Sequence, residues 1–440
     1  MIIERNHIRQ WVLGLILLSP FTFHLSPSYA QDYARLSERT IMGTARYVGM
    51  GGAMTAVGGD PSAVLDNVAG LGLYRRPEVM ITFDYVPRSI FMAPQASAIF
   101  TFQTGQNQGV ICHNFMIGYH RVHCFNQSMQ ATSGKGASLG SLIATTPAYL
   151  GIDYTSDRYH AADSLSVYER GYVNEYSFDW AMNISNRWYW GLGLRVQSFL
   201  MSSDGDYYEV FDKQNADLQP YFNRSRTSLM FSGAGCSFAT GLIYRPSQWV
   251  RIGFGLETPS LGNMTISSTG RFDARTDSLR RGNDAPPLRD ETSSFHMPLR
   301  LSASVAFQVL DYALLAFQYD YRHVQRSYDV HSLRAGLELT PYNGVYINAG
   351  YVFESPFKKH IAAYLIDSAW ERRDAYYQYP RYQQYISGAV GYRGNYMIIQ
   401  AAYQYRMNRY KLYAHQNAEP YYMAQDTHRI VLTLAWHGRN

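Results

Sequence analysis

The chain has 440 residues, and 39 Lys and Arg against 34 Asp and Glu give a formal net charge of +5 at pH 7. Because the two signs are interspersed, this small excess argues against a nucleic-acid-binding surface. Three Cys in a chain of this length exclude a small disulfide-stapled domain, and they lack the spacing of a zinc site.

The first thirty residues have the pattern of an export signal. Arg5 and Arg9 precede an apolar run over residues 11–25, and small residues surround Ala30. The run is too short to span a bilayer comfortably. We therefore expect residues 1–30 to be a signal peptide and the mature chain to function outside the cytoplasm.

A glycine-rich stretch, "GMGGAMTAVGGDPSAVLDNVAGLG", occupies residues 49–72. It does not fit a dinucleotide fingerprint, because Met54 stands where the third glycine belongs, and it has no Lys for a phosphate loop. Asp60 as N-cap, Pro61 at the first helical position and Gly70 or Gly72 as terminator instead predict a short helix. The glycines permit tight turns and close backbone approach, so we expect a compact segment that fits inside a barrel.

After residue 77 the sequence alternates apolar and polar residues with the period of β-strands. In residues 396–409, for example, Met397, Ile399 and Tyr403 share one face while Gln400 and Gln404 lie on the other. Fourteen strands are predicted near 79–87, 94–102, 110–124, 174–184, 188–202, 233–244, 249–258, 297–308, 312–323, 332–339, 345–354, 384–392, 396–409 and 429–436.

Short and long connections alternate strictly between these strands. The tight turns lie at 185–188, 245–248, 309–312, 340–344 and 392–395; the long connections lie at 125–173, 203–226, 259–295, 324–331, 355–383 and 410–428. A soluble sandwich has no reason to show this asymmetry, whereas outer-membrane barrels combine short periplasmic turns with long outer loops. Trp249 and Trp436 end apolar faces, as in aromatic girdles. The fold class is therefore all-β: a transmembrane antiparallel β-barrel of about 14 strands, in the bacterial outer membrane.

Strand parity predicts a polar lumen with six charges of each sign. The inward residues are Glu175, Asp179, Arg195, Arg251, Glu257, Arg300, Asp320, Arg322, Arg334, Glu338, Glu354 and Arg406. Such a balance favours mutual pairing over ion selectivity. Because a barrel of this size is too wide for strand side chains to fill, we expect another part of the chain to plug it.

Residues 43–72, "GTARYVGMGGAMTAVGGDPSAVLDNVAGLG", resemble the N-terminal hatch of the FadL/TodX family of outer-membrane transport proteins, with "DPSA" and "NVAGL" in the family's motif positions. The resemblance implies a hatch over residues 31–77 inside a barrel over residues 78–440. It also implies a gate at Asp60, Pro61, Asn67, Val68, Ala69 and Gly70. Val68 replaces the family's Pro, which predicts a less rigid turn.

The resemblance implies passive uptake of a hydrophobic small molecule, such as a long-chain fatty acid or an aromatic hydrocarbon, through a barrel surrounded by outer-membrane lipids. Residues 369–385, rich in Tyr, are the richest candidate for ligand capture, although an interfacial tyrosine cluster with a solvated loop is the favoured explanation of this stretch. The alternative is a PorV-like interaction protein that assists secretion, with residues 269–291 as a charged, mobile partner surface.

We expect no enzyme activity and no cofactor, because no nucleophile motif is present. His113, His120 and His123 lie close together in sequence but their parities place them on different faces, so we expect no metal site there.

Overall fold

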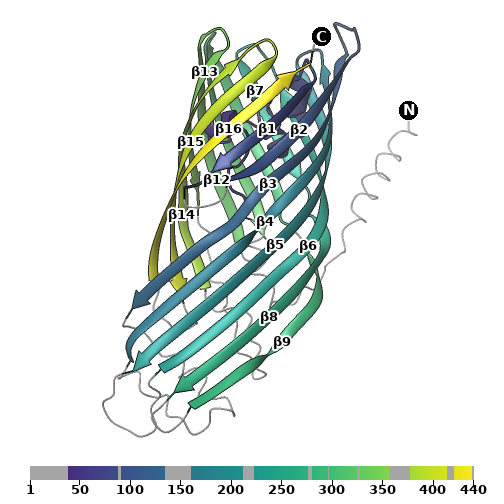
Figure 1. Ribbon diagram of the computed structural model, residues 1–440. Coiled ribbons are helices and arrows are strands. Elements are labelled where there is room, and N and C mark those ends of the chain that lie inside the picture. The colour runs from purple at the N-terminus through teal and green to yellow at the C-terminus, as the bar shows by residue number, and fades with distance from the viewer. Residues whose placement is uncertain are drawn as a thin grey trace, which may run out of the picture.

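A computed structural model describes residues 38–87, 91–133, 160–211, 222–275, 280–295, 297–324, 328–355, 377–413 and 421–438 (Figure 1). The predicted signal peptide lies outside these ranges. Most of the described chain is β-strand, and the strands surround a short helical segment near the N-terminus.

The strands form one closed antiparallel barrel. In the described part of the chain they are β1 Glu78–Tyr85, β2 Phe91–Gln103, β3 Val110–Ser133, β4 His160–Ile184, β5 Trp188–Phe211, β6 Phe222–Tyr244, β7 Val250–Glu257, β8 Leu261–Arg275, β9 Arg280–Phe295, β10 Leu299–Leu310, β11 Ala313–Val324, β12 Tyr328–Tyr342, β13 Val345–Glu354, β14 Tyr377–Arg393, β15 Met397–Tyr413 and β16 Tyr421–His437. Consecutive strands pair from β1 to β6 and from β10 to β16, and β1 closes the ring against β16 from Glu78↔His437 to Tyr85↔Ile430.

Two of the strands are interrupted. β6 pairs with both β7 and β8, while β10 pairs with β7 and β9 pairs with β8. The segments β7 and β8 therefore follow one strand path, broken at Pro259, and β9 and β10 follow the next, broken at Pro298. Counted as paths, the barrel has fourteen strands, which confirms the predicted number.

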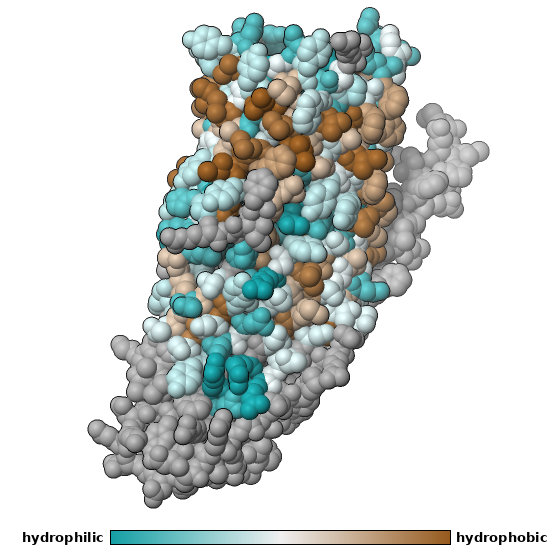
Figure 2. Space-filling model, in the orientation of Figure 1, coloured by the Kyte–Doolittle hydropathy of each residue, from teal (hydrophilic) through white to brown (hydrophobic). Residues whose placement is uncertain are grey.

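An apolar belt surrounds the barrel near its short connections. Exterior residues alternate with buried ones along each strand, and Figure 2 shows brown side chains gathered over the upper part of the visible face. Trp249 and Trp436, each 46% exposed, lie at its edge. Apolar residues outside and paired backbone throughout are what a lipid-embedded sheet requires. We call the end with short connections the turn end and the opposite end the loop end.

Each predicted strand range overlaps an observed strand, but the predicted long loops were wrong in part. Residues 259–295 were predicted to be a connection, and 269–291 a mobile surface, yet β8 and β9 occupy most of that range. Likewise β3 continues to Ser133, and β4 already begins at His160. Outside the lipid belt the exterior face is polar, so the alternation that revealed the other strands is missing there. The result is a tall wall of β3–β6, β8 and β9 on one side of the barrel (Figure 1).

The N-terminal insert, residues 38–77, lies inside the barrel near the turn end. It contains α3 Ala45–Gly49, α4 Ala63–Asp66 and the 3-10 helix η2 Val68–Leu73, which contact strands on both sides of the lumen. None of the described helices is long and apolar enough to cross a membrane. Barrel strands begin at Glu78, directly after the insert.

The predicted helix within the insert was placed incorrectly. α4 begins at Ala63 with Ser62 at its N-cap and ends at Asp66, so neither Asp60 nor Gly70 bounds it. Asp60 instead accepts hydrogen bonds from the Ser62 amide, at 2.8 Å, and from the Thr44 hydroxyl, at 2.6 Å. The carboxylate thus joins the start of α4 to Thr44, which precedes α3.

Glycines on the wall let the insert touch the strand backbones. A Cβ on Gly241 would lie 1.8 Å from Asn67 Oδ1, and one on Gly255 would lie 1.9 Å from the Asp66 carbonyl oxygen. On the opposite side, a Cβ on Gly350 would meet the Gly51 nitrogen at 2.1 Å, and Gly51 has a φ of +60°. Backbone therefore meets backbone across this interface, which leaves no room for side chains.

Gly241→Ala tests this packing. We expect the added methyl group to displace Asn67 and to lower stability by roughly 1–3 kcal/mol, the usual cost of overpacking. Thermal unfolding in detergent, followed by tryptophan fluorescence, measures the change. Gly388→Ala is the control, because its Cβ would meet only the Asn348 carbonyl at 3.5 Å. Equal stability of the two variants would contradict close packing at Gly241.

Candidate functional site

Five arginines of the barrel wall donate hydrogen bonds to backbone carbonyls of the insert. The pairs are Arg195 with Val64 (3.1 Å), Arg251 with Val57 (3.1 Å), Arg334 with Gly52 (3.2 Å), Arg429 with Ile41 (2.6 Å), and Arg300 with Leu65. The insert has little regular secondary structure, so many of its buried carbonyls need donors from elsewhere. The wall supplies these donors from five different strands.

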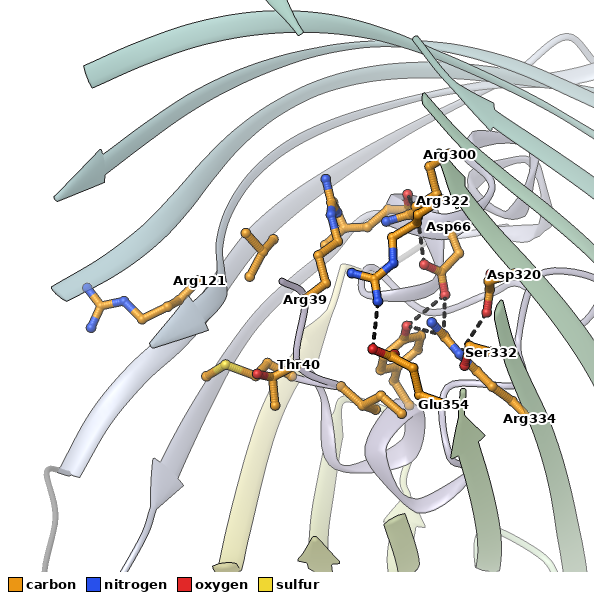
Figure 3. A pocket seen from close by; sticks show the side chains of 15 residues that line it. Arg39, Thr40, Asp66, Arg121, Arg300, Asp320, Arg322, Ser332, Arg334 and Glu354 are labelled. Atoms are coloured by element: carbon orange, nitrogen blue, oxygen red, sulfur yellow. Dashed lines mark hydrogen bonds and ion pairs between the residues drawn. The ribbon is translucent and has the colours of Figure 1, made fainter. Parts of the chain in front are cut away.

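Asp66 is the central acidic group of the interface (Figure 3). Its carboxylate accepts from Arg300 Nη2 at 2.7 Å, from Arg334 Nη1 at 3.1 Å and from the Tyr47 hydroxyl at 2.6 Å. Arg334 also contacts Asp320 Oδ2 at 2.8 Å. One residue of the insert therefore links two arginines that belong to β10 and β12.

The environment of Asp66 favours its charged form. Burial alone would raise the pKa, but the guanidinium groups of Arg334 and Arg300 outweigh burial and lower the pKa of Asp66 below its ordinary value. Burial raises the pKa of the Tyr47 hydroxyl, and the adjacent carboxylate raises it further, so this hydroxyl remains a donor. The group of charges is therefore stable as an ion-paired cluster at neutral pH.

The insert also contributes arginines of its own, which pair with acidic residues of the wall. Arg39 Nη2 lies 2.9 Å from Glu175 and 3.1 Å from Glu257. Arg46 contacts Glu338 through two nitrogens, at 2.6 and 2.9 Å, and Glu338 also accepts from Asn348. Removing one partner from such a buried pair costs roughly 3–5 kcal/mol, so these contacts oppose ejection of the whole insert.

The predicted gate residues Asn67 to Gly70 occupy the start of η2. Asn67 Oδ1 accepts from the Ala69 amide at 3.0 Å, and its Nδ2 donates to the carbonyls of Thr55 and Leu242. Val68 is buried in an apolar cluster with wall residues. The Gly70 carbonyl accepts from the Gly59 amide at 3.1 Å. Asn67 therefore fixes the turn by its own side chain and also attaches it to β6.

The lumen charges predicted from the sequence do not all contact the insert. Arg195, Arg251, Arg300, Arg334 and Glu338 contact the insert, and Asp320 acts on it through Arg334. Arg406 is separate: it donates to Gln383 at 3.1 Å and lies 5.7 Å from the centre of the Tyr385 ring. Its position along β15 is nearer the loop end.

Several residues of this interface were not chosen from the sequence. Arg39, Arg46 and Asp66 are charged residues in a segment of mostly small and apolar residues. This contrast in the sequence could have identified them as candidates for ion pairs with the wall. Arg429, which also pairs with Asp84 at 2.6 Å, has inward parity on its strand. The three histidines make separate contacts: His113 stacks on Trp180, His120 contacts Ser177, and His123 contacts Thr40. The predicted separation of His120 from His123 by parity was wrong, because a β-bulge between Arg121 and His123 leaves both histidines buried. The described residues contain no cluster of metal ligands.

The lumen is nearly filled beside this network. A cavity of about 40 Å³ is enclosed by residues of the insert and of five strands; its charged lining residues are Arg39, Asp66, Arg121, Arg300, Asp320, Arg322, Arg334 and Glu354. Its volume is enough for water but not for an organic solute. Around this cavity the insert and the wall leave no room for a solute, and we call this level the closed layer.

Nearer the loop end, the inner surface changes from charged to apolar. One continuous cluster of buried residues consists of Leu65, Val122, Phe125, Val173, Phe199, Met201, Leu229, Phe231, Met264, Ile266 and Met297. We call it the lumenal apolar cluster. Leu65 belongs to the insert, and most of the others lie on the inner face of the tall wall. The lumenal apolar cluster is therefore in contact with the closed layer through Leu65.

The wall has an unpaired step beside this cluster. Pairing between β2 and β3 ends at Gln95↔His120, although β3 continues with β4 to Ser133. At that point the insert approaches β3, and the Thr40 amide donates to the Val122 carbonyl at 3.1 Å. The Thr40 hydroxyl also lies 3.0 Å from His123 Nδ1. The insert at Thr40 therefore contacts the edge of β3 beyond the point where pairing with β2 ends.

Comparison with known proteins identifies the fold. No family model and no curated protein sequence matches the chain. Its structure is similar to that of a Pseudomonas aeruginosa FadL homologue, at 11% identity and a TM-score of 0.53, over 91% of this chain and 99% of that one. The Ralstonia pickettii toluene transporter TbuX aligns at 14% identity and a TM-score of 0.49, over 91% and 99%. At 11% identity, the likeness to the FadL homologue establishes a common fold and no more.

Val68→Pro tests whether the turn needs Val. Val68 is the first residue of η2, where Pro fits without losing a helical hydrogen bond, and Asn67 is extended, as a residue before Pro prefers. We expect the midpoint of thermal unfolding to change by only a few degrees. Ala69→Pro is the matched control; it removes the amide that caps onto Asn67 and should lower stability by roughly 1 kcal/mol or more. Equal losses in both variants would contradict this account of the turn.

Asp66→Asn should lower stability by roughly 3–5 kcal/mol, because two buried arginines lose their counter-charge. Since the folded-state pKa of Asp66 is lowered, its contribution is complete above the unfolded value of about 3.9 and is lost as pH falls through the lowered pKa. When the pH falls, the stability of the Asp66→Asn variant should therefore decrease less than that of the wild type. Unfolding measured between pH 2 and 7 tests both points.

Asp60→Asn is the control for Asp66→Asn. Burial raises the pKa of Asp60 against the opposing influence of Arg46 and of the bonds from Thr44 and Ser62. The neutral form of Asp60 is therefore more favoured than that of Asp66. Replacing Asp60 with a neutral amide should lower stability less than the same change at Asp66. A larger loss at Asp60 than at Asp66 would overturn the central role of Asp66.

Proposed function

We propose that this protein is a member of the FadL/TodX family and a bacterial outer-membrane channel for passive uptake of hydrophobic small molecules, with long-chain fatty acids or aromatic hydrocarbons as the solute class. The transmembrane barrel, the N-terminal segment inside it and the fold shared with a FadL homologue support the proposal.

The lumenal apolar cluster carries this proposal. A water-filled porin has a polar lumen, whereas here Phe125, Phe199 and Phe231 with three methionines are buried against one another on the inner side of the wall. Methionine is flexible and polarisable, so such a lining can adapt to solutes of different shape. A hydrophobic molecule entering from the loop end gains free energy by leaving water, and the cluster offers it a site above the closed layer.

We propose that the solute leaves through the step between β2 and β3 rather than through the insert. Displacing the insert breaks ion pairs at Asp66, Arg39 and Arg46 together. Moving the short segment at Thr40 breaks its backbone hydrogen bond to Val122, the contact of its hydroxyl with His123 and the ion pairs of the adjacent Arg39, but leaves those of Asp66 and Arg46 intact. The smaller change requires less free energy, and it opens toward lipid, where an apolar solute is most soluble.

The predicted gate at Asn67 to Gly70 therefore becomes, in this proposal, a fixed part of the plug. The PorV-like interpretation stays an alternative, but the apolar lining favours a solute over a protein partner. Residues 369–376 of the predicted capture segment lie outside the described residues, and the 377–385 portion belongs to β14.

Met264→Asp tests the apolar path. Met264 is fully buried in the lumenal apolar cluster on β8, and a carboxylate there should reduce uptake of a fatty acid or an aromatic hydrocarbon by tenfold or more. Uptake into liposomes, with a fluorescent fatty acid or with toluene as the solute, measures the effect.

Thr265→Asp is the matched control, because the adjacent residue faces the opposite side of the same strand and should leave uptake unchanged. Wild-type protein that accelerates neither solute beyond an unrelated barrel would refute the proposed transport. Equal losses in the two variants would refute the apolar path.

A further inference from the structure

The outer surface of the barrel carries a polar motif twice, at the same register. On β11 and β12, Tyr321 is paired with His331; on β15 and β16, Tyr405 is paired with His428. Tyr319 precedes Tyr321 by two residues, and its hydroxyl lies 2.6 Å from His331 Nδ1. Tyr403 likewise precedes Tyr405, and its hydroxyl lies 2.6 Å from His428 Nδ1.

An aspartate completes each copy. Tyr321 donates to Asp329 at 3.0 Å, and Tyr405 donates to Asp426 at 2.9 Å. In the first copy His323 also contacts Asp329 at 2.9 Å, and its ring stacks on Tyr321. The first copy is therefore built from hydroxyls, imidazoles and one carboxylate.

The first copy lies at the outer edge of the apolar belt. Along the exterior of β11 the residues change from Leu315 and Phe317 to Tyr319, Tyr321 and His323. The stretch from Ala313, the start of β11, to Tyr321 is nine residues long including both ends, and a tilted strand of this length crosses the hydrocarbon core. The motif is therefore at the height of lipid headgroups.

Directly below it is a groove of about 690 Å³. Ala303 lies between Phe254 and Tyr319 in register, and Ala335 lies between Phe317 and Tyr351. These two small side chains form the floor, the aromatic ones form the sides, and Tyr319 joins the groove to the polar motif. Such a volume is within the range of small-molecule sites.

We infer that this groove and motif together bind one glycolipid, with an acyl chain in the groove and a sugar headgroup against Tyr319, Tyr321 and His331. A belt-level groove is open to lipid, so its occupant has a hydrocarbon chain. Tyrosine hydroxyls, an imidazole and a carboxylate beside flat rings suit the hydroxyl groups and faces of a sugar. The site lies outside the barrel and is independent of the proposed transport.

Native mass spectrometry of the full-length protein in lauryldimethylamine oxide tests the inference. The probes are monoglucosyl diacylglycerol and phosphatidylethanolamine with identical chains. We expect one glucolipid per protein and at least tenfold weaker binding of the phospholipid. Tyr319→Phe with Tyr321→Phe should reduce glucolipid binding about tenfold without affecting the phospholipid, because only headgroup bonds are lost.

Two further variants separate the parts of the site. Ala335→Phe fills the groove from the lipid side and should abolish binding of both lipids while uptake and thermal stability stay unchanged. Tyr403→Phe with Tyr405→Phe removes the same hydroxyls from the second motif and should have no effect. Equal binding of the two lipids, or equal effects of the two tyrosine pairs, would overturn the inference.

Discussion

The structure depends on one requirement, that an irregular segment enclosed in a lumen must have its backbone carbonyls satisfied. The insert makes only short helices, so it cannot bond these groups internally as a long helix does. Arginine suits the task, because its planar group carries five donors on a long side chain and is always charged. Each wall arginine then needs a counter-charge, which explains why acids such as Asp66 and Asp320 lie beside them. The polar lumen is thus a consequence of having an insert, and need not mark a path for ions.

The same constraint explains why small residues occur on both partners. An arginine reaches a carbonyl only if the two backbones are close, and Gly241, Gly255 and Gly350 keep them close. Apolar contact is concentrated elsewhere, in the lumenal apolar cluster beyond the insert. Charged and apolar surfaces are therefore separated along the barrel axis, so an apolar molecule meets a favourable surface first and a closed, charged layer second.

Much of the barrel could be predicted from the sequence, because lipid outside and a polar lumen inside impose a two-residue period. The fourteen strands follow from it, and so does the inward parity of residues such as Arg195 and Arg300. Beyond the lipid belt the exterior is polar, so the alternation disappears and β8 and β9 were interpreted as a loop. The interface residues Arg39, Arg46 and Asp66 could not be assigned partners, because pairing across 136 to 292 positions depends on how the insert is oriented. The capping role of Asp60 was mistaken because a helix start was inferred without the competing hydroxyl of Thr44.

The breaks at Pro259 and Pro298 have a mechanical consequence. Proline has no amide hydrogen, so neighbouring strand paths each lack a ladder bond at about the same height, where the Met297 amide donates to the Ser260 hydroxyl instead. These two strand paths are therefore less restrained at this height than β3 to β6, which pass it without a break. The segments β8 and β9 can bend outward from the lipid-embedded ladder formed by β7 and β10, whereas β3 to β6 keep their part of the wall straight.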